Sequence, residues 1–250
     1  MGTGFTFQIE GEPADPFLLK MSESALEILE DANQRFSLYL PESEISKLVS
    51  GRLEWSRATP TQLSIRDQVL EWKEVTEGFF DAKVGTSEYD PSGLVKSWAT
   101  SNAANFLLAN GIRRFTINAG GDVILSPEVE SEVLNRVGLA NLVSIASSES
   151  GSNIVLDLKG SQFRAVATSG ISERGEHIWR TDESAAIIQV SVIGVDLVAA
   201  DIWATAIVAG GMEAWEIFLS QPNETLRAVV TTRDGAIFSS PGFAELLARL

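Results

Sequence analysis

The sequence contains no cysteine and a single histidine, His177. Without cysteine the chain has no disulfide, no thiolate nucleophile, no iron–sulfur cluster and no zinc–thiolate site. With one histidine it has no multi-histidine metal cage. A metal held by side chains alone would need mostly oxygen ligands, which favours magnesium, calcium or manganese.

Basic residues are also scarce. The chain carries 19 Lys and Arg against 34 Asp and Glu, for a formal net charge of −15. Contacts to a nucleic-acid backbone need clustered Lys and Arg, so the composition argues against a nucleic-acid partner. If an anionic phosphate ligand binds to so acidic a chain, a bridging cation is the simplest way to hold it.

Long apolar runs are missing as well. The longest apolar stretches fall short of the roughly 20 residues that a transmembrane helix needs. The first ten residues, MGTGFTFQIE, have neither the basic region nor the apolar core of a signal peptide. We therefore expect no transmembrane segment and a cytoplasmic location.

The spacing of apolar residues along the chain is that of an ordinary folded protein. Apolar residues make up 44% of the 250 residues, enough for a sizeable core. Residue spacing, caps and turn signals predict the following elements. Helices are predicted at residues 16–36, 61–77, 92–109, 199–209, 212–219 and 241–250. Strands are predicted at residues 5–9, 115–118, 123–125, 154–158, 163–167, 189–195, 226–231 and 236–239.

These elements predict a single domain over residues 1–250. The fold class is α+β, or mixed α/β, with mixed or antiparallel sheets flanked by helices. We expect strands 154–158 and 163–167 to pair with each other, and residues 126–153 to form an irregular excursion rich in Ser and Glu. In helix 61–77 we expect Leu63, Val69, Leu70 and Val75 to face the core.

Asp201 and Thr205 form the best local signal for a metal site. They lie four residues apart on a predicted helix, so their side chains share a face. A carboxylate and a hydroxyl on one face supply two hard oxygen ligands, which suits magnesium. The alternative is a surface Asp beside a Thr that bonds to a backbone carbonyl.

Three further segments could contact a ligand. The segment from Asp90 to Lys96 enters a helix whose first N–H groups favour an anion, although an Asp-Pro turn that caps the helix explains it equally well. Residues 167–170, Ala-Thr-Ser-Gly, can present hydroxyls and amides at a strand end, or form an ordinary turn. The glycines of Asn118-Ala-Gly-Gly-Asp122 let the backbone approach a ligand or a packed helix.

Taken in chain order, these segments resemble the ApbE-type FAD:protein FMN transferase family over nearly the whole chain. Seven segments carry the resemblance: Met1-Gly2-Thr3, Phe36 to Tyr39 with Ser43 to Ser46, Thr76 to Asp81, Tyr89 to Lys96, Asn118 to Asp122, Ala167 to Gly170, and Ala200 to Thr205. Their order along the chain makes a chance match improbable. The resemblance implies an ApbE-like fold.

The resemblance also implies a reaction and a site. Members of this family bind FAD and magnesium and pass the FMN half to a Thr or Ser hydroxyl of a target flavoprotein, with release of AMP. By position, magnesium would be held by Asp201, Thr205 and the backbone carbonyl near Gly93. The FAD site would be lined by Met1, Tyr39, Phe79, Phe80, Asp81, Asp90, Lys96, Thr168, Ser169 and Gly170. His177 would activate the acceptor hydroxyl as the catalytic base.

One segment departs from the family pattern. The family motif His-x-x-Asp-Pro-x-Thr-Gly is not continued after His177, where residues 178–183 read IWRTDE. Two alternatives to protein flavinylation therefore stay open. One is a magnesium-dependent FAD pyrophosphatase that makes FMN and AMP, with water in place of the acceptor hydroxyl. The other is a flavin-binding module that is not an enzyme.

Overall fold

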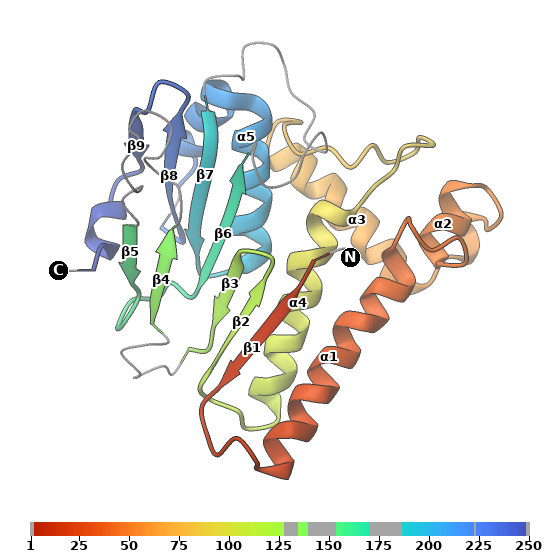
Figure 1. The fold of residues 1–250 in the computed structure, drawn as a ribbon. Helices are drawn as coiled ribbons and strands as arrows, with labels where there is room; N and C mark the ends of the chain where they lie inside the picture. The colour runs from red at the N-terminus through yellow and green to blue at the C-terminus, as the bar shows by residue number, and fades with distance from the viewer. Residues whose placement is uncertain (1–2, 128–134, 140–153, 171–186, 223, 249–250) are drawn as a thin grey trace.

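The computed structural model describes residues 3–127, 135–139, 154–170, 187–222 and 224–248. In these ranges seven strands form one antiparallel sheet (Figure 1). Their order across the sheet is β1 (Phe5–Ile9), β2 (Phe115–Ala119), β3 (Asp122–Leu125), β6 (Ala165–Gly170), β7 (Ile187–Gly194), β8 (Leu226–Thr232) and β9 (Ile237–Ser239). A separate antiparallel pair is formed by β4 (Arg136–Leu139) and β5 (Ile154–Asp157).

The helices cover one face of the sheet and the small strand pair covers part of the other (Figure 1). The α-helices are α1 (Pro16–Phe36), α2 (Glu44–Val49), α3 (Pro60–Val75), α4 (Ser92–Ala109) and α5 (Leu197–Ser220). Short 3₁₀ turns are formed by Trp55–Arg57 and Phe243–Leu246. Because α4 packs on β2 and β3 while α5 packs on β6 and β7, the two helices meet over the middle of the sheet.

The start of α1 follows from its sequence. The Asp15 carboxylate accepts the backbone N–H of Phe17 at 2.8 Å, and Pro16 occupies the first helical position, where its missing N–H costs nothing. The buried positions of this helix recur every three or four residues: Met21, Ala25, Leu29, Ala32 and Phe36. This stripe packs against α4 and the β1–β2 end of the sheet.

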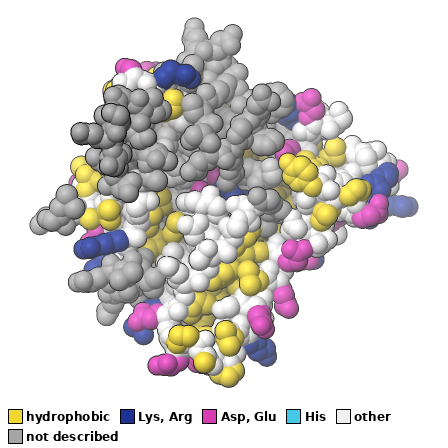
Figure 2. All heavy atoms as spheres, viewed as in Figure 1, with side chains coloured by type: hydrophobic (Ala, Val, Ile, Leu, Met, Phe, Trp, Pro, Cys, Tyr) yellow, Lys and Arg dark blue, Asp and Glu magenta, His cyan; other side chains and the backbone are white. Residues whose placement is uncertain are grey.

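The edge of the sheet at β1 carries an apolar band on the molecular surface. Figure 2 shows it running diagonally over β1 and the adjoining part of α1. Phe5 and Phe7 are half-buried, while Phe17 and Leu19 are exposed. The first strand is therefore only partly covered by the helix that follows it.

Helix α5 is the central core helix. Asp196 caps it by accepting the N–H of Ala199 at 2.8 Å, and Gly211, at φ 60° and ψ −137°, kinks it. This kink explains why the sequence predicts two helices here. The helix is long and apolar enough to cross a membrane, but 78% of its apolar window is buried inside the protein. A core helix passes the same test, so this is weak support for a membrane span.

The predicted fold class is confirmed, since one antiparallel sheet and its flanking helices form a mixed α/β fold. The predicted pairing of strands 154–158 and 163–167 is wrong. The chain from Asp157 to Ala165 is not a hairpin turn, because β5 pairs with β4 whereas β6 pairs with β3 and β7. Each of the two strands thus belongs to a different layer.

Three smaller expectations are also corrected. Residues 136–139 lie in the predicted irregular excursion but form β4, in which Val137 and Leu139 are buried and Arg136 and Gly138 are exposed. The closing helix predicted at 241–250 is only the 3₁₀ turn Phe243–Leu246 in the described part of the chain. In α3 the core-facing residues are Gln62, Ile65 and Val69, whereas Leu70 and Val75 are exposed.

Candidate functional site

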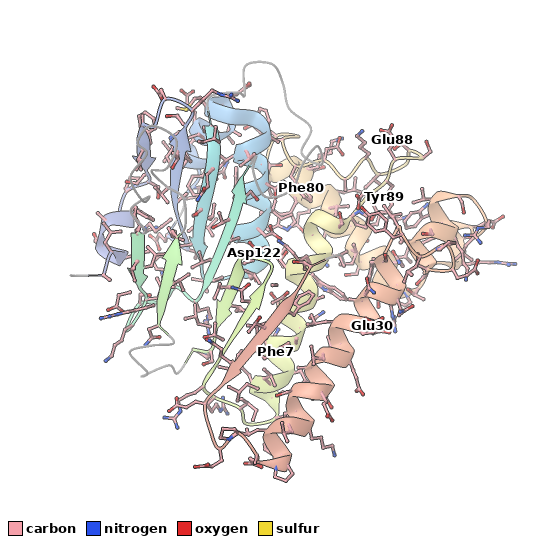
Figure 3. All side chains as sticks on the ribbon, in the orientation of Figure 1. Phe7, Glu30, Phe80, Glu88, Tyr89 and Asp122 are labelled. Atoms are coloured by element: carbon pink, nitrogen blue, oxygen red, sulfur yellow. The ribbon has the colours of Figure 1, made fainter. Side chains whose placement is uncertain are left out.

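The site begins with a hairpin that fixes one carboxylate. Strands β2 and β3 are joined by the two residues Gly120 and Gly121, both at positive φ. Such a turn strongly favours glycine, because a side chain at positive φ is strained. The turn makes Asp122 the first residue of β3 and directs the chain back beneath α4, and Figure 3 shows Asp122 between the sheet and this helix. The glycines thus build a tight turn that positions Asp122.

A buried cluster of three charged side chains joins β3, α4 and α5. The Lys96 ammonium forms an ion pair with Asp122 Oδ2 and lies 3.5 Å from Asp201 Oδ2. All three residues are nearly inaccessible, with exposed fractions of 5% for Lys96, 0% for Asp122 and 3% for Asp201. Two carboxylates share one ammonium, so the cluster carries an excess negative charge when all three groups are ionised.

The electrostatics of the cluster reflect its burial. Desolvation, followed by the neighbouring Asp201 carboxylate, raises the pKa of Asp122 to about 6, and the Lys96 ammonium opposes this rise. The other oxygen of Asp122, Oδ1, accepts the backbone N–H of Thr168 at 3.1 Å. Asp122 therefore connects the lysine of α4 to the end of β6.

Hydroxyl groups line the adjoining side of the cluster. Ser169 Oγ and Thr205 Oγ1 are hydrogen-bonded at 3.4 Å, which joins β6 to α5 one turn beyond Asp201. Thr168 Oγ1 and Ser191 Oγ are hydrogen-bonded at 2.9 Å across β6 and β7. The strand end predicted to bind a ligand therefore faces the helix predicted to bind the metal.

Two phenylalanines support the helices of the site. The ring of Phe80 lies over the first turn of α4, where a Cβ at Gly93 would come within 3.1 Å of its Cε2 atom. The half-buried ring of Phe79 lies against α5, where a Cβ at Gly210 would overlap it. Both residues were predicted to line the FAD site, but in this structure Phe80 belongs to the core beneath it.

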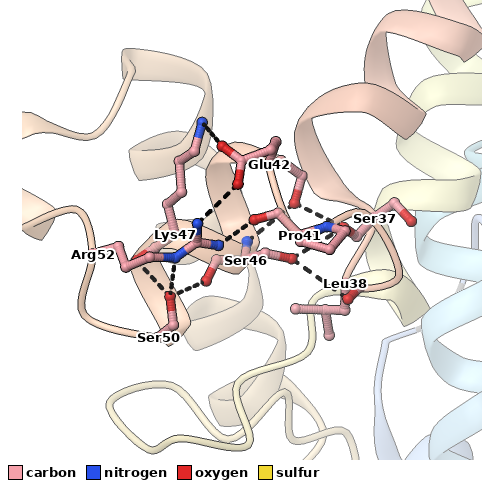
Figure 4. Close-up of polar contacts among 9 residues, drawn as sticks. Ser37, Leu38, Pro41, Glu42, Ser46, Lys47, Ser50 and Arg52 are labelled. Atoms are coloured by element: carbon pink, nitrogen blue, oxygen red, sulfur yellow. Dashed lines mark hydrogen bonds and ion pairs between the residues drawn. The ribbon is translucent and has the colours of Figure 1, made fainter.

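Tyr39 lies on the surface, with an exposed fraction of 82%. Its loop between α1 and α2 is held in shape by the polar contacts drawn in Figure 4. Ser43 Oγ donates to the Ser37 carbonyl at 2.8 Å, and Arg52 bonds to the Pro41 carbonyl and, at 3.0 Å, to the Glu42 carboxylate. The exposed aromatic ring is thus carried by a loop with a defined conformation.

Asp81 and Asp90 each have a local partner. Asp81 forms an ion pair with Lys73 at 2.9 Å and accepts the backbone N–H of Lys83 at 2.8 Å. These contacts outweigh partial burial and lower the pKa of Asp81. Asp90 accepts the N–H of Ser92 at 2.9 Å. This contact forms the Asp-Pro turn that was the alternative explanation for the segment from Asp90 to Lys96. Their predicted contacts to FAD remain predictions.

The structure thus brings together five of the predicted site residues and leaves two outside its description. Those brought together are Lys96, Thr168, Ser169, Asp201 and Thr205, through contacts of α4, β3, β6 and α5. Gly93 lies three residues before Lys96 on α4. Gly170 ends β6. Met1 and His177 lie outside the described residues. Asp122 was not predicted as a site residue, although its position directly after a strand and two glycines was the available signal.

The donor atoms fit a small hard cation. Asp201 Oδ2 is buried and accepts no hydrogen bond from the described part of the chain, with the Lys96 ammonium 3.5 Å away. An orphaned carboxylate oxygen beside a threonine hydroxyl is the kind of donor set that magnesium prefers. Over the same described residues, no group of three or more His, Asp and Glu side chains is placed to hold a metal. The described part of the chain therefore offers few charged ligands.

The fold and the site define a mixed α/β protein with a buried carboxylate cluster where two helices meet over one antiparallel sheet. Residues 85–230 match the model of the ApbE family. The chain belongs to this family. No functionally curated protein matches the chain in sequence.

Solved structures share the fold along the whole chain. Flavin transferase ApbE from Vibrio cholerae is 19% identical with a TM-score of 0.78, covering 99% of this chain and 96% of that one. The ApbE protein from Thermotoga maritima is 19% identical with a TM-score of 0.76, covering 99% and 97%. Pseudomonas stutzeri flavinyl transferase ApbE, in its apo form, is 15% identical with a TM-score of 0.77, covering 99% and 96%.

Proposed function

We propose that this chain is an FAD:protein FMN transferase that uses magnesium. It would move FMN from FAD to a Thr or Ser hydroxyl of an acceptor flavoprotein and release AMP. The observation that carries the proposal is the Asp201 carboxylate oxygen without a hydrogen bond, on α5 one turn before the Thr205 hydroxyl that bonds to Ser169. Membership of the ApbE family and the flavin transferases among the similar structures support it.

Each residue of the cluster has a role in this proposal. Asp201 Oδ2, Thr205 Oγ1 and the carbonyl near Gly93 would hold the magnesium ion. When bound, magnesium neutralises charge on the diphosphate of FAD, where the bond to AMP breaks. Asp122 and Lys96 hold β3, α4 and β6 together around Asp201. Thr168, Ser169 and Gly170 would approach the diphosphate from the end of β6.

The remaining FAD contacts are proposed around the carboxylate cluster, that of Phe80 from the core beneath it. Met1, Tyr39, Phe79, Phe80, Asp81 and Asp90 would line the flavin and nucleotide portions. His177 would accept the proton of the acceptor hydroxyl, a form of catalysis typically worth about 10²–10⁴ in rate. An exposed aromatic ring on a defined loop, as at Tyr39, can cover a flat ring system.

The test is incubation of the protein with FAD, magnesium and candidate acceptor proteins, followed by mass spectrometry. An acceptor that gains one FMN on a Thr or Ser, with matching release of AMP, supports the transferase. His177→Ala is the matched variant, because it removes the proposed base and leaves the Asp201–Thr205 site intact. It should abolish transfer while FAD binding survives, and rapid transfer by the variant would refute the role of His177.

A second candidate function is a magnesium-dependent FAD pyrophosphatase. The residues after His177 favour it, because Ile178 to Glu183 lack the Asp-Pro-x-Thr-Gly sequence of the family motif. A pyrophosphatase would release AMP at the same rate with and without an acceptor. A transferase would release AMP rapidly only when the acceptor is present, so one AMP assay separates the two functions.

A further inference from the structure

The contacts of Lys96 determine which carboxylate oxygens of the buried cluster are available to a metal ion. The Lys96 ammonium touches one oxygen of each buried carboxylate, Asp122 Oδ2 and Asp201 Oδ2. The two contacts differ, since the one to Asp122 is a direct hydrogen bond and the one to Asp201 is a longer ion pair of 3.5 Å. Lys96 therefore donates a hydrogen bond to Asp122 Oδ2 and leaves Asp201 Oδ2 without a hydrogen bond from the described residues.

The other oxygen of Asp122 is also engaged. Asp122 Oδ1 accepts the N–H of Thr168 at 3.1 Å, so both oxygens of this carboxylate accept hydrogen bonds, whereas Asp201 Oδ2 has only the longer ion pair to Lys96 at 3.5 Å. A cation entering the cluster thus meets a single available carboxylate and the hydroxyl of Thr205. One carboxylate is a weak protein site for magnesium, which usually completes its octahedral shell with waters and substrate phosphates.

We propose that Lys96 masks Asp122 and thereby makes magnesium binding depend on the diphosphate of the substrate. Resting on the proposed function, this inference makes Lys96 a positioning residue that regulates the same site. With Asp122 masked, the protein holds magnesium poorly alone, and the anionic substrate supplies the missing oxygen ligands. Binding of the cation and of FAD is then mutually favourable, because each improves the affinity for the other by the same factor.

Lys96→Met is the direct test, because methionine has a similar length and no charge. Without the ammonium, Asp122 Oδ2 and Asp201 Oδ2 both face the space that the ammonium occupies in the wild type, so both can bind a cation. Melting temperature is followed against magnesium concentration, without FAD and with saturating FAD. In the wild type, FAD should lower the magnesium midpoint about tenfold or more, within the usual range of coupling. In Lys96→Met, magnesium alone should bind about tenfold more tightly, and the effect of FAD should shrink.

Two variants keep the test decisive if Lys96→Met does not fold. The double variant Lys96→Met/Asp122→Asn preserves the net charge and again leaves Asp201 as the single carboxylate, so it should need FAD to bind magnesium, as the wild type does. Asp122→Asn alone removes the competing carboxylate, so the Lys96 ammonium, now 3.5 Å from Asp201 Oδ2, can pair with Asp201 more closely. It should therefore weaken magnesium binding about tenfold or more even with FAD present. Lys159→Met, at an exposed lysine, controls for the loss of one positive charge.

The outcomes separate the two proposals. If magnesium and FAD together leave the wild-type melting temperature unchanged, the proposed function fails and the masking role falls with it. If the wild type shows coupled binding but Lys96→Met has the same magnesium midpoint without FAD, the masking role alone is overturned. Should Lys96→Met not fold, Asp122→Asn binding magnesium as tightly as the wild type in FAD would overturn it equally.

Discussion

At the scale of single residues, two buried carboxylates differ in what surrounds them. Asp122 has a lysine on one oxygen and a backbone N–H on the other, whereas Asp201 Oδ2 lacks a hydrogen bond within the described chain. Burying a carboxylate oxygen without a hydrogen bond costs free energy, and a protein tolerates it chiefly where a ligand supplies the missing contact. This contrast is the basis for proposing a structural role for Asp122 and a ligand-binding role for Asp201.

Replacing Asp201 with Asn should separate binding from stability. The variant removes the charged ligand and the repulsion on Asp122 but keeps the Lys96–Asp122 ion pair. Turnover with magnesium should fall about 100-fold or more, while the metal-free melting temperature stays close to wild type. Thr205→Val should lower turnover less, since a neutral hydroxyl contributes less than a carboxylate. Magnesium titrations of both variants that match the wild type would contradict the proposed ligands.

The raised pKa of Asp122 predicts how stability changes with pH. Its folded value of about 6 lies above the ordinary value of 3.8, so the folded chain binds this proton more tightly than the unfolded chain. The stability that this proton contributes is complete below about pH 4 and is lost as the pH rises through about 6. The direction is opposite to that of a carboxyl whose folded pKa is depressed.

Urea unfolding of the metal-free protein in chelator, at several pH values from about 4 to 7, measures this effect. Other carboxyls titrate in the same range, so the relevant quantity is the wild-type free energy of unfolding minus that of Asp122→Asn. This difference should fall by at most about 3 kcal/mol between pH 4 and pH 6.5. A difference that is constant or rises with pH would show that the carboxyl is not protonated preferentially in the folded chain.

At the scale of elements, local signals predicted the helices better than the strand pairing. A few neighbouring residues predict where α1 begins, at Asp15-Pro16, and where α4 ends, before Gly111. The structure confirms both helices. The pairing of β5 with β4 depends on residues in separate segments of the chain, so proximity in sequence wrongly favoured β6. The exposure of Leu70 likewise depends on which face of α3 meets the core.

The close packing of Phe79 on α5 gives a prediction for this helix. A Cβ at Gly210 would overlap the Phe79 ring and lie 2.7 Å from Ala214 Cβ, so Gly210→Ala should lower the free energy of unfolding by about 1–3 kcal/mol. Gly138→Ala is the matched control, because nothing lies within 4 Å of its Cβ position and its φ is not positive. Denaturant unfolding measures both.

A double-mutant cycle identifies the ring as the cause. In a Phe79→Ala background the obstacle to Gly210→Ala is largely removed, so the second substitution should cost clearly less than in the wild type. Equal costs in both backgrounds would mean that the loss comes from Ala214 or from the kink at Gly211, and that Phe79 does not limit the approach to α5.

At the scale of the whole molecule, the site draws on elements far apart in sequence. Gly93 and Lys96 enter from α4, Asp122 from β3, Ser169 from β6, and Asp201 from α5. Sequence spacing alone could relate Asp201 to Thr205, because they share one helix. It could not place Lys96 against both carboxylates, since that contact exists only after the sheet has aligned β3 with β6. Only the resemblance to the ApbE family grouped the residues of α4 and β6 with Asp201 and Thr205 in one predicted site.

Because the site joins so many elements, its ligands should stabilise the whole fold. FAD with magnesium should raise the melting temperature, since a ligand that binds only the native state adds about 2.7 kcal/mol at a concentration of 100 times Kd. For a chain of this size that corresponds to roughly 5–10 °C. Magnesium alone and FAD alone should each give a smaller shift, and Asp201→Asn should lose most of the magnesium-dependent part. A shift that is equally large in Asp201→Asn would mean that FAD stabilises the chain through contacts that do not involve the carboxylate cluster.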